Sequence, residues 1–180
     1  MKLSVIGDSI TYLAKKYGAI EQFAEHGIEA SLDGKPGARA DSPTRYEALK
    51  NACIGLGSDD ILILALGTND MMYETFLDEV GEQQLSTDEL ANIVGHLHRG
   101  LAYSEVATNA KVFWINITER TMKGYYNQGA KLLNKTIVES KYPVVDWNGK
   151  RAHTSDTIHP TRDGVKLWVE AILEAIEINQ

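Results

Sequence analysis

Two motifs near opposite ends of the sequence contain the residue types that acyl transfer requires. Ser9 closes the short motif Gly7-Asp8-Ser9, and Asp156 precedes His159 by three residues. A serine hydroxyl becomes a nucleophile when a neutral imidazole removes its proton, and a hydrogen-bonded carboxylate orients that imidazole and stabilises its positive charge. One turn of chain can bring the Asp156 carboxylate to the His159 ring. Ser9, His159 and Asp156 are therefore the candidate nucleophile, base and orienting acid.

Donors for an oxyanion are present in other parts of the chain. A tetrahedral intermediate carries a negatively charged oxygen, which needs preorganised hydrogen-bond donors. The candidates are the backbone N–H groups of Ser9 and Gly37 and the side-chain amide of Asn69. Gly37 belongs to the Gly-rich turn 33–39, where the absence of a Cβ lets the backbone approach a bound group. Gly34 in the same turn is the alternative to Gly37.

The spacing of apolar residues predicts short strands that alternate with helices. Helices are expected from Ser42-Pro43, from the capping box Ser86–Glu89 and from about Thr161. This alternation predicts one domain over residues 1–180, a doubly wound, three-layer α/β/α unit with a parallel sheet covered on both faces. The five expected strands are Lys2–Ile6, Ile28–Leu32, Asp60–Leu66, Lys111–Ile117 and Pro143–Val145.

Each candidate residue follows a predicted strand. Ser9 follows the first strand, Gly37 the second and Asn69 the third, while Asp156 and His159 come after the fifth. In open parallel sheets, functional sites lie beyond the carboxyl ends of the strands. We therefore expect all five residues at the same edge of the sheet.

This set of motifs, in this order, resembles the SGNH hydrolases, also called the GDSL family. The family signatures are a GDS turn, a glycine after the second strand, a GxND turn and a DxxH motif. The resemblance spans most of the chain and implies a flavodoxin-like fold with a five-stranded sheet. It also implies that Ser9 is the nucleophile, His159 the base and Asp156 its orienting acid, with Ser9, Gly37 and Asn69 forming the oxyanion hole. The matching segments are Gly7-Asp8-Ser9, Gly37, Gly67-Thr68-Asn69-Asp70 and Asp156-Thr157-Ile158-His159.

Simpler structural roles are open for several of these residues. Ser9 could cap the first helix, and Asn69-Asp70 could form an Asx turn in which Asp70 is structural. Asp8 is expected to stabilise the turn or the helix start rather than to take part in chemistry. His96 and His98 are two residues apart on a predicted helix and face different directions, so no metal pair is expected there.

Composition excludes several classes of function. The 180 residues are 43% hydrophobic and 24% charged, and the net charge of −7 comes without the cluster of Lys and Arg that nucleic-acid binding requires. The longest apolar run, Ile61–Leu66, is far too short to span a membrane. A lone Cys53 excludes an internal disulfide and a Cys/His zinc cluster, and no metal or organic cofactor is expected. Asp8 follows Met1 too closely for a signal peptide, which favours the cytoplasm, although a secreted domain without its leader would look the same.

The sequence predicts a serine esterase that hydrolyses a carboxylic ester or thioester through an acyl-enzyme on Ser9. The expected substrate is a small-molecule or carbohydrate ester. The alternatives are a non-catalytic carbohydrate-binding or structural module on the same fold, and an acyltransferase that uses the same triad. Six acidic residues between Glu74 and Glu89, with no basic residue among them, would disfavour anionic substrates if they border the pocket, or else form a solvated face. Acyl group, leaving group and oligomeric state do not follow from the sequence.

Overall fold

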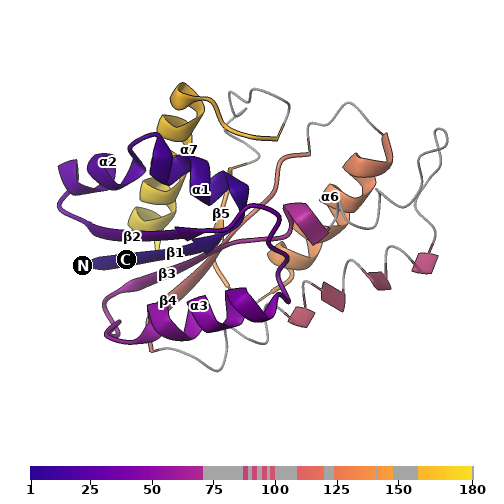
Figure 1. The fold of residues 1–180 in the computed structure, drawn as a ribbon, viewed down its shortest axis with the longest axis horizontal. Helices are drawn as coiled ribbons and strands as arrows, with labels where there is room; N and C mark the ends of the chain where they lie inside the picture. The colour runs from indigo at the N-terminus through magenta and orange to yellow at the C-terminus, as the bar shows by residue number, and fades with distance from the viewer. Residues whose placement is uncertain are drawn as a thin grey trace.

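The computed structural model describes residues 1–70, 87–88, 91–92, 95–96, 98–99, 109–119, 124–140, 142–147 and 158–179. Within them, five strands form one sheet in the order β2-β1-β3-β4-β5, and every neighbouring pair is parallel (Figure 1). The predicted five-stranded parallel sheet is therefore confirmed. The strands are β1 Lys2–Gly7, β2 Glu29–Gly34, β3 Ile61–Ala65, β4 Lys111–Ile115 and β5 Val144–Val145.

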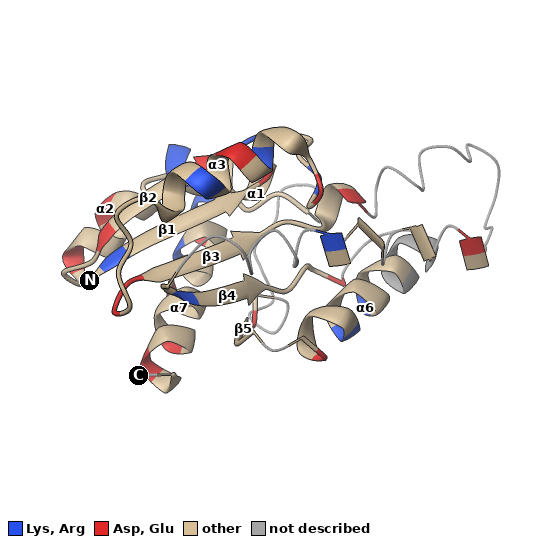
Figure 2. Ribbon diagram, turned by 90° about the horizontal axis from the view of Figure 1, so that it is seen from below, with Lys and Arg blue, Asp and Glu red and all other residues tan. Residues whose placement is uncertain are grey.

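Helices cover both faces of this sheet, which confirms the three-layer architecture. Side chains of β3 alternate between two cores: Ile61 and Ile63 face one layer of helices, and Leu62 and Leu64 face the other. Because both faces are covered, a strand without polar residues is favourable here. Charged residues lie mainly on the helices and connections around the central strands (Figure 2). The first layer contains α1 Ser9–Lys16, α2 Ala19–Glu25 and α7 Arg162–Ile178, and the second contains α3 Pro43–Cys53 and α6 Gly124–Val138.

The helix starts predicted from capping residues lie where expected. Thr161 is the N-cap of α7, and its hydroxyl accepts a hydrogen bond from Gly164 N–H at 3.1 Å. Ser42 is the N-cap of α3, with Pro43 in the first turn, but its hydroxyl bonds no helix N–H. It lies 2.9 Å from the Thr44 hydroxyl instead. The predicted start of this helix is therefore confirmed, although Ser42 caps it without a side-chain hydrogen bond.

Several element boundaries differ from the sequence prediction. Strand β2 starts one residue later and extends to Gly34, and β3 and β4 end earlier, at Ala65 and Ile115. Helices α2 and α6 are additional to the predicted ones. Of the predicted capping box at 86–89, only residues 87 and 88 are described, and both are helical. Among the described helices, none combines the length and apolar character needed to cross a membrane.

Candidate active site

The Ser9 hydroxyl and the His159 ring meet at the carboxyl edge of the sheet. Ser9 is the first residue of α1, directly after β1, and His159 lies shortly before α7. Although 150 residues separate them in the chain, Ser9 Oγ lies 2.8 Å from His159 Nε2. When the proton of the neutral ring is on Nδ1, Nε2 accepts the hydroxyl hydrogen, as a general base must. Both residues are half-buried, so each keeps part of its surface exposed to solvent.

The turn from β1 into α1 depends on glycine at its start. A Cβ at Gly7 would lie 2.7 Å from Thr11 Cβ and still closer to the Thr11 hydroxyl. Asp8 is the N-cap of α1, and its Oδ1 accepts a hydrogen bond from Ile10 N–H at 2.9 Å. The role at the helix start predicted for Asp8 is therefore confirmed. Ser9 itself is left as the first helical residue, where backbone N–H groups have no intrahelical acceptor.

The Asn69 amide is fixed with its nitrogen toward the loop that follows β2. Asn69 Nδ2 donates to the carbonyl oxygen of Ala38 at 3.0 Å and to Asp8 Oδ2 at 3.4 Å. Only the amide nitrogen carries hydrogens, so two acceptors on one side select this orientation. The bond to Asp8 is the longer and weaker of the two, and the role of the Asn69 amide as an oxyanion donor stays a prediction.

The two glycines proposed for the oxyanion hole have different surroundings. Gly34 is the last residue of β2, and a Cβ there would lie 2.6 Å from Tyr12 Cα, so this glycine permits β2 to pack against the backbone of α1. Gly37 has a φ of 74°, and no atom lies within 4 Å of the position that its Cβ would take. Among the described hydrogen bonds, none uses the Gly37 N–H. Gly37 rather than Gly34 is therefore the better candidate donor, and its role stays a prediction.

Two features expected from the sequence lie outside the described residues. One is Asp156, the predicted orienting acid of His159, and the other is the acidic segment from 74 to 82. The contact between Asp156 and His159 and the effect of the acidic segment on substrate charge stay predictions.

The Asp8 carboxylate connects the nucleophile turn with Asn69. It is fully buried. Burial raises the pKa of the Asp8 carboxyl to about 7; the hydrogen bond from Ile10 N–H opposes this rise, the nearby Asp70 adds to it, and the charge of His159 again opposes it. An ionisable group that interacts electrostatically with the candidate base therefore lies directly beside the candidate nucleophile Ser9.

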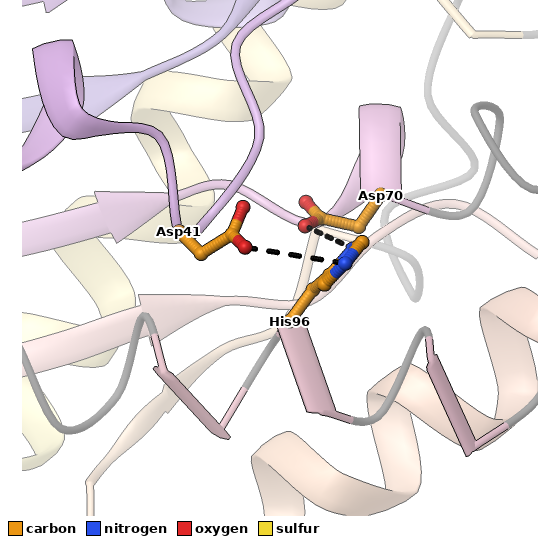
Figure 3. Close-up of side chains that lie close together, drawn as sticks. All are labelled: Asp41, Asp70 and His96. Atoms are coloured by element: carbon orange, nitrogen blue, oxygen red, sulfur yellow. Dashed lines mark ion pairs between the residues drawn. The ribbon is translucent and has the colours of Figure 1, made fainter.

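A further polar cluster is formed by the half-buried Asp41 with the buried Asp70 and His96, whose side chains point toward one another (Figure 3). Asp70 directly follows Asn69 in the chain. His96 Nδ1 is 3.6 Å from Asp70 Oδ1, and His96 Nε2 is 3.9 Å from Asp41 Oδ2. Arg39 contacts all three residues, with Nη2 3.3 Å from Asp41 Oδ1 and Nε 3.9 Å from Asp70 Oδ1. Arg99 Nη2 is 3.1 Å from Asp41 Oδ2. No motif or spacing in the sequence indicates this cluster, although Asp41 and Asp70 both follow strands that end at this edge.

Asp70 is the most buried member of the cluster. Its side chain is fully buried, and both of its carboxylate oxygens accept from Ala40 N–H, at 3.2 and 3.0 Å. Burial raises the pKa of the Asp70 carboxyl to about 6; the Ala40 bond and the charge of Arg39 oppose the rise, and Asp41 adds to it. The structural role predicted for Asp70 is thus a contact with the loop after β2.

The cluster fits an ion-pair network better than a metal centre. Two carboxylates and an imidazole form a donor set that divalent metals use, and the possible ligand atoms of Asp41, Asp70 and His96 lie within 4.8 Å of one another. However, the guanidinium groups of Arg39 and Arg99 already balance the two carboxylates. A metal ion between these ligands would lie against Arg39 and repel it.

Comparison with protein-family models gives no match, and comparison with curated proteins gives no significant match. Solved structures do match over nearly the whole chain. A lipolytic protein of the G-D-S-L family from Veillonella parvula has a TM-score of 0.69 at 16% identity, covering 97% of this chain and 97% of that one. An aryl esterase from M. smegmatis has a TM-score of 0.65 at 14% identity, covering 98% of each chain.

A third similar structure is a catalytic mutant of an acetylxylan esterase from Geobacillus stearothermophilus. Its TM-score is 0.62 at 19% identity, with 97% of this chain and 93% of that one covered. At such identities the likeness establishes the fold. The chain has the three-layer α/β fold of the GDSL hydrolases, as its motifs implied.

Proposed function

We propose that the protein is a serine hydrolase that cleaves a carboxylic ester or thioester through an acyl-enzyme on Ser9. The observation that carries the proposal is the distance of 2.8 Å between Ser9 Oγ and His159 Nε2. A serine that only capped α1 would need no imidazole at its hydroxyl, and Asp8 already occupies the capping position. The shared fold of esterases among the similar structures supports the same reaction class.

In the first half of the proposed reaction, His159 Nε2 takes the hydroxyl proton as Ser9 Oγ forms a bond to the ester carbonyl carbon. The carbonyl oxygen becomes an oxyanion, which the N–H groups of Ser9 and Gly37 and the Asn69 amide would stabilise. Collapse of the intermediate breaks the bond to the leaving oxygen or sulfur. That atom receives the proton from His159, and the acyl group stays on Ser9.

In the second half, a water molecule gives a proton to His159 Nε2 and attacks the acyl carbon. The second tetrahedral intermediate breaks its bond to Ser9 Oγ, which recovers the proton, and the carboxylic acid leaves. Asp156 is assigned as the acid that holds the imidazole and stabilises its positive charge. Aryl acetates and acetylated xylo-oligosaccharides are the first substrates to test, because an aryl esterase and an acetylxylan esterase are among the similar structures.

The nucleophile is tested by covalent labelling and turnover. We expect the wild-type protein to react with a fluorophosphonate probe and to hydrolyse at least one ester of such a panel. The Ser9→Ala variant should lose labelling and nearly all hydrolysis while it keeps its Tm. Ser58→Ala is the matched control, because Ser58 is an exposed serine in the loop before β3. This variant should keep both the labelling by the probe and the ester hydrolysis. Undiminished labelling of Ser9→Ala at another serine would refute the assignment.

The same assay separates the alternative functions. An acyltransferase would also be labelled at Ser9, but it would pass the acyl group to an added alcohol or sugar hydroxyl faster than to water. A binding module would show neither labelling nor turnover in the wild-type protein. Absence of both labelling and turnover would refute the proposal.

A further inference from the structure

Two consecutive residues after β3 hold the same segment of the loop after β2. Asn69 Nδ2 donates to the Ala38 carbonyl at 3.0 Å, and both carboxylate oxygens of Asp70 accept from Ala40 N–H, at 3.2 and 3.0 Å. Ala38 and Ala40 are buried. The segment directly follows Gly37, so these bonds fix the position of one candidate oxyanion donor relative to another.

These bonds cross the strand that carries the nucleophile. In the sheet, β1 lies between β2 and β3. Contacts between the loop after β2 and the turn after β3 therefore pass over the carboxyl end of β1, where Ser9 begins α1. The two connections and the nucleophile turn meet at this point, which is where an oxyanion would form.

Burying the Asp70 carboxylate completely carries a large desolvation penalty. Removing a charge from water is unfavourable unless it is paired and hydrogen-bonded. Asp70 has such partners in Ala40 N–H, in Arg39 and in His96, and the last two also contact Asp41. The charge strengthens the bond to the loop, since hydrogen bonds to ionised acceptors are roughly twice as strong as neutral ones.

We infer that Asp70 is a positioning residue for the oxyanion hole: with Arg39 and His96 it holds the loop of Gly37 and Ala38 against Asn69. This inference rests on the proposed esterase function and names a residue that acts through Asn69 and the loop. It predicts that loss of the Asp70 carboxylate impairs the chemical step more than substrate binding, because the oxyanion exists only during the reaction.

The first test compares kcat and KM of the wild type and three variants on the best ester substrate. Asp70→Ala should lower kcat about 10²-fold with KM nearly unchanged, as a displacement of about 1 Å at the reacting groups can do. Asp70→Asn keeps an acceptor for Ala40 N–H and should recover part of the loss. Asp60→Ala is the matched control: Asp60 also accepts backbone N–H bonds, from Lys2 at 2.7 Å and Gly57 at 2.9 Å, but it lies before β3, at the opposite edge of the sheet. It should keep the wild-type kcat.

A double-mutant cycle separates positioning from general destabilisation. Asn69→Ala alone should lower kcat by about 10²- to 10³-fold if its amide is an oxyanion donor. In that background, Asp70→Ala should cost less than about threefold, because its effect passes through the same oxyanion hole. An equal loss in both backgrounds, or a wild-type kcat in Asp70→Ala, would overturn the inference.

Amide exchange provides a readout that does not depend on esterase activity. The Ala40 amide should exchange much faster in Asp70→Ala than in the wild type, while Asp60→Ala leaves it unchanged. Unchanged exchange at Ala40 in Asp70→Ala would overturn the inference even if the wild-type protein proves not to be an esterase. An unlabelled wild-type protein without turnover would refute the proposed function separately.

Discussion

Replacing Asp8 with asparagine should stabilise the protein at neutral pH and have little effect near pH 4. The Asp8 side chain is fully buried, which raises the pKa of its carboxyl from 3.8 to about 7. Between these two values, the folded protein binds a proton at Asp8 that the unfolded chain has released. The free energy of unfolding therefore falls as the pH rises through this range. At about 1.36 kcal/mol per pKa unit, the full destabilisation is about 4 kcal/mol, and it is complete above pH 7.

Asparagine removes this cost but also removes a favourable contact. Its Oδ1 can still accept from Ile10 N–H, while its NH2 group would face the Asn69 amide, which also donates. Losing one such bond costs about 1 kcal/mol, so the expected net gain at pH 8 is about 3 kcal/mol. The free energy of unfolding of Asp8→Asn should still fall with rising pH, but less steeply, because burial also raises the pKa of Asp70, to about 6.

The measurement is urea-induced unfolding at pH 5, 6, 7 and 8, followed by the fluorescence of the three tryptophans, all of them buried. Asp60→Asn is the control, and its effect on the free energy of unfolding should have the opposite sign, because hydrogen bonds from Gly57 and Lys2 lower the pKa of Asp60. Its carboxylate contributes stability above the unfolded pKa, so asparagine should weaken the protein at neutral pH. The reasoning would be refuted if the free energy of unfolding of the wild type stayed constant or rose from pH 5 to pH 8 and Asp8→Asn showed the same pH dependence.

Two further predictions concern the glycine loop and the orienting acid. Gly34→Ala should destabilise the protein by about 3 kcal/mol or more, because its Cβ meets the backbone of Tyr12, whereas Gly37→Ala has open space and should cost about 1–2 kcal/mol for its positive φ. Thermal unfolding of the two variants checks this order, and the reverse order would contradict it. Asp156→Asn should lower kcat by about 10⁴-fold with little change in Tm, because an amide neither fixes the His159 tautomer nor stabilises its positive charge. An undiminished kcat in steady-state ester hydrolysis would show that another carboxylate serves His159.

The sheet could be predicted because its signal is local. The apolar residues of β3 show a strand buried on both faces, and alternation with helices implies parallel pairing. Helix α2 has only seven residues, too few to show a clear period. Helix α6 contains Gly124 and Gly129, which lower its intrinsic propensity, and its helical form is supported by packing of Ala130, Leu133 and Ile137 against the sheet.

Part of the candidate site could likewise be predicted from local motifs, and part of it could not. Ser9, His159 and Asn69 could be found because each belongs to a short motif placed after a predicted strand. The cluster of Asp41, Asp70 and His96 could not, because its members come from three separate segments with no common spacing. In the sequence, the nearest possible partner of His96 is His98, and the contacts of His96 with Asp41 and Asp70 become visible only in the folded structure. Burial of charged groups against one another depends on tertiary packing, which no local pattern encodes.

The long separation of Ser9 and His159 makes the candidate site dependent on the last helix. Ser9 belongs to the first turn of α1, and His159 lies in the chain that leads into α7, which packs on the same face of the sheet. Release of α7 from the sheet would carry the His159 imidazole away from the Ser9 hydroxyl, and it would also remove Trp168 and Ile172 from the core on that face. Under the proposed function, activity would therefore require that the C-terminal helix has docked on the sheet. The same packing that completes this core therefore brings the two side chains of the candidate site together.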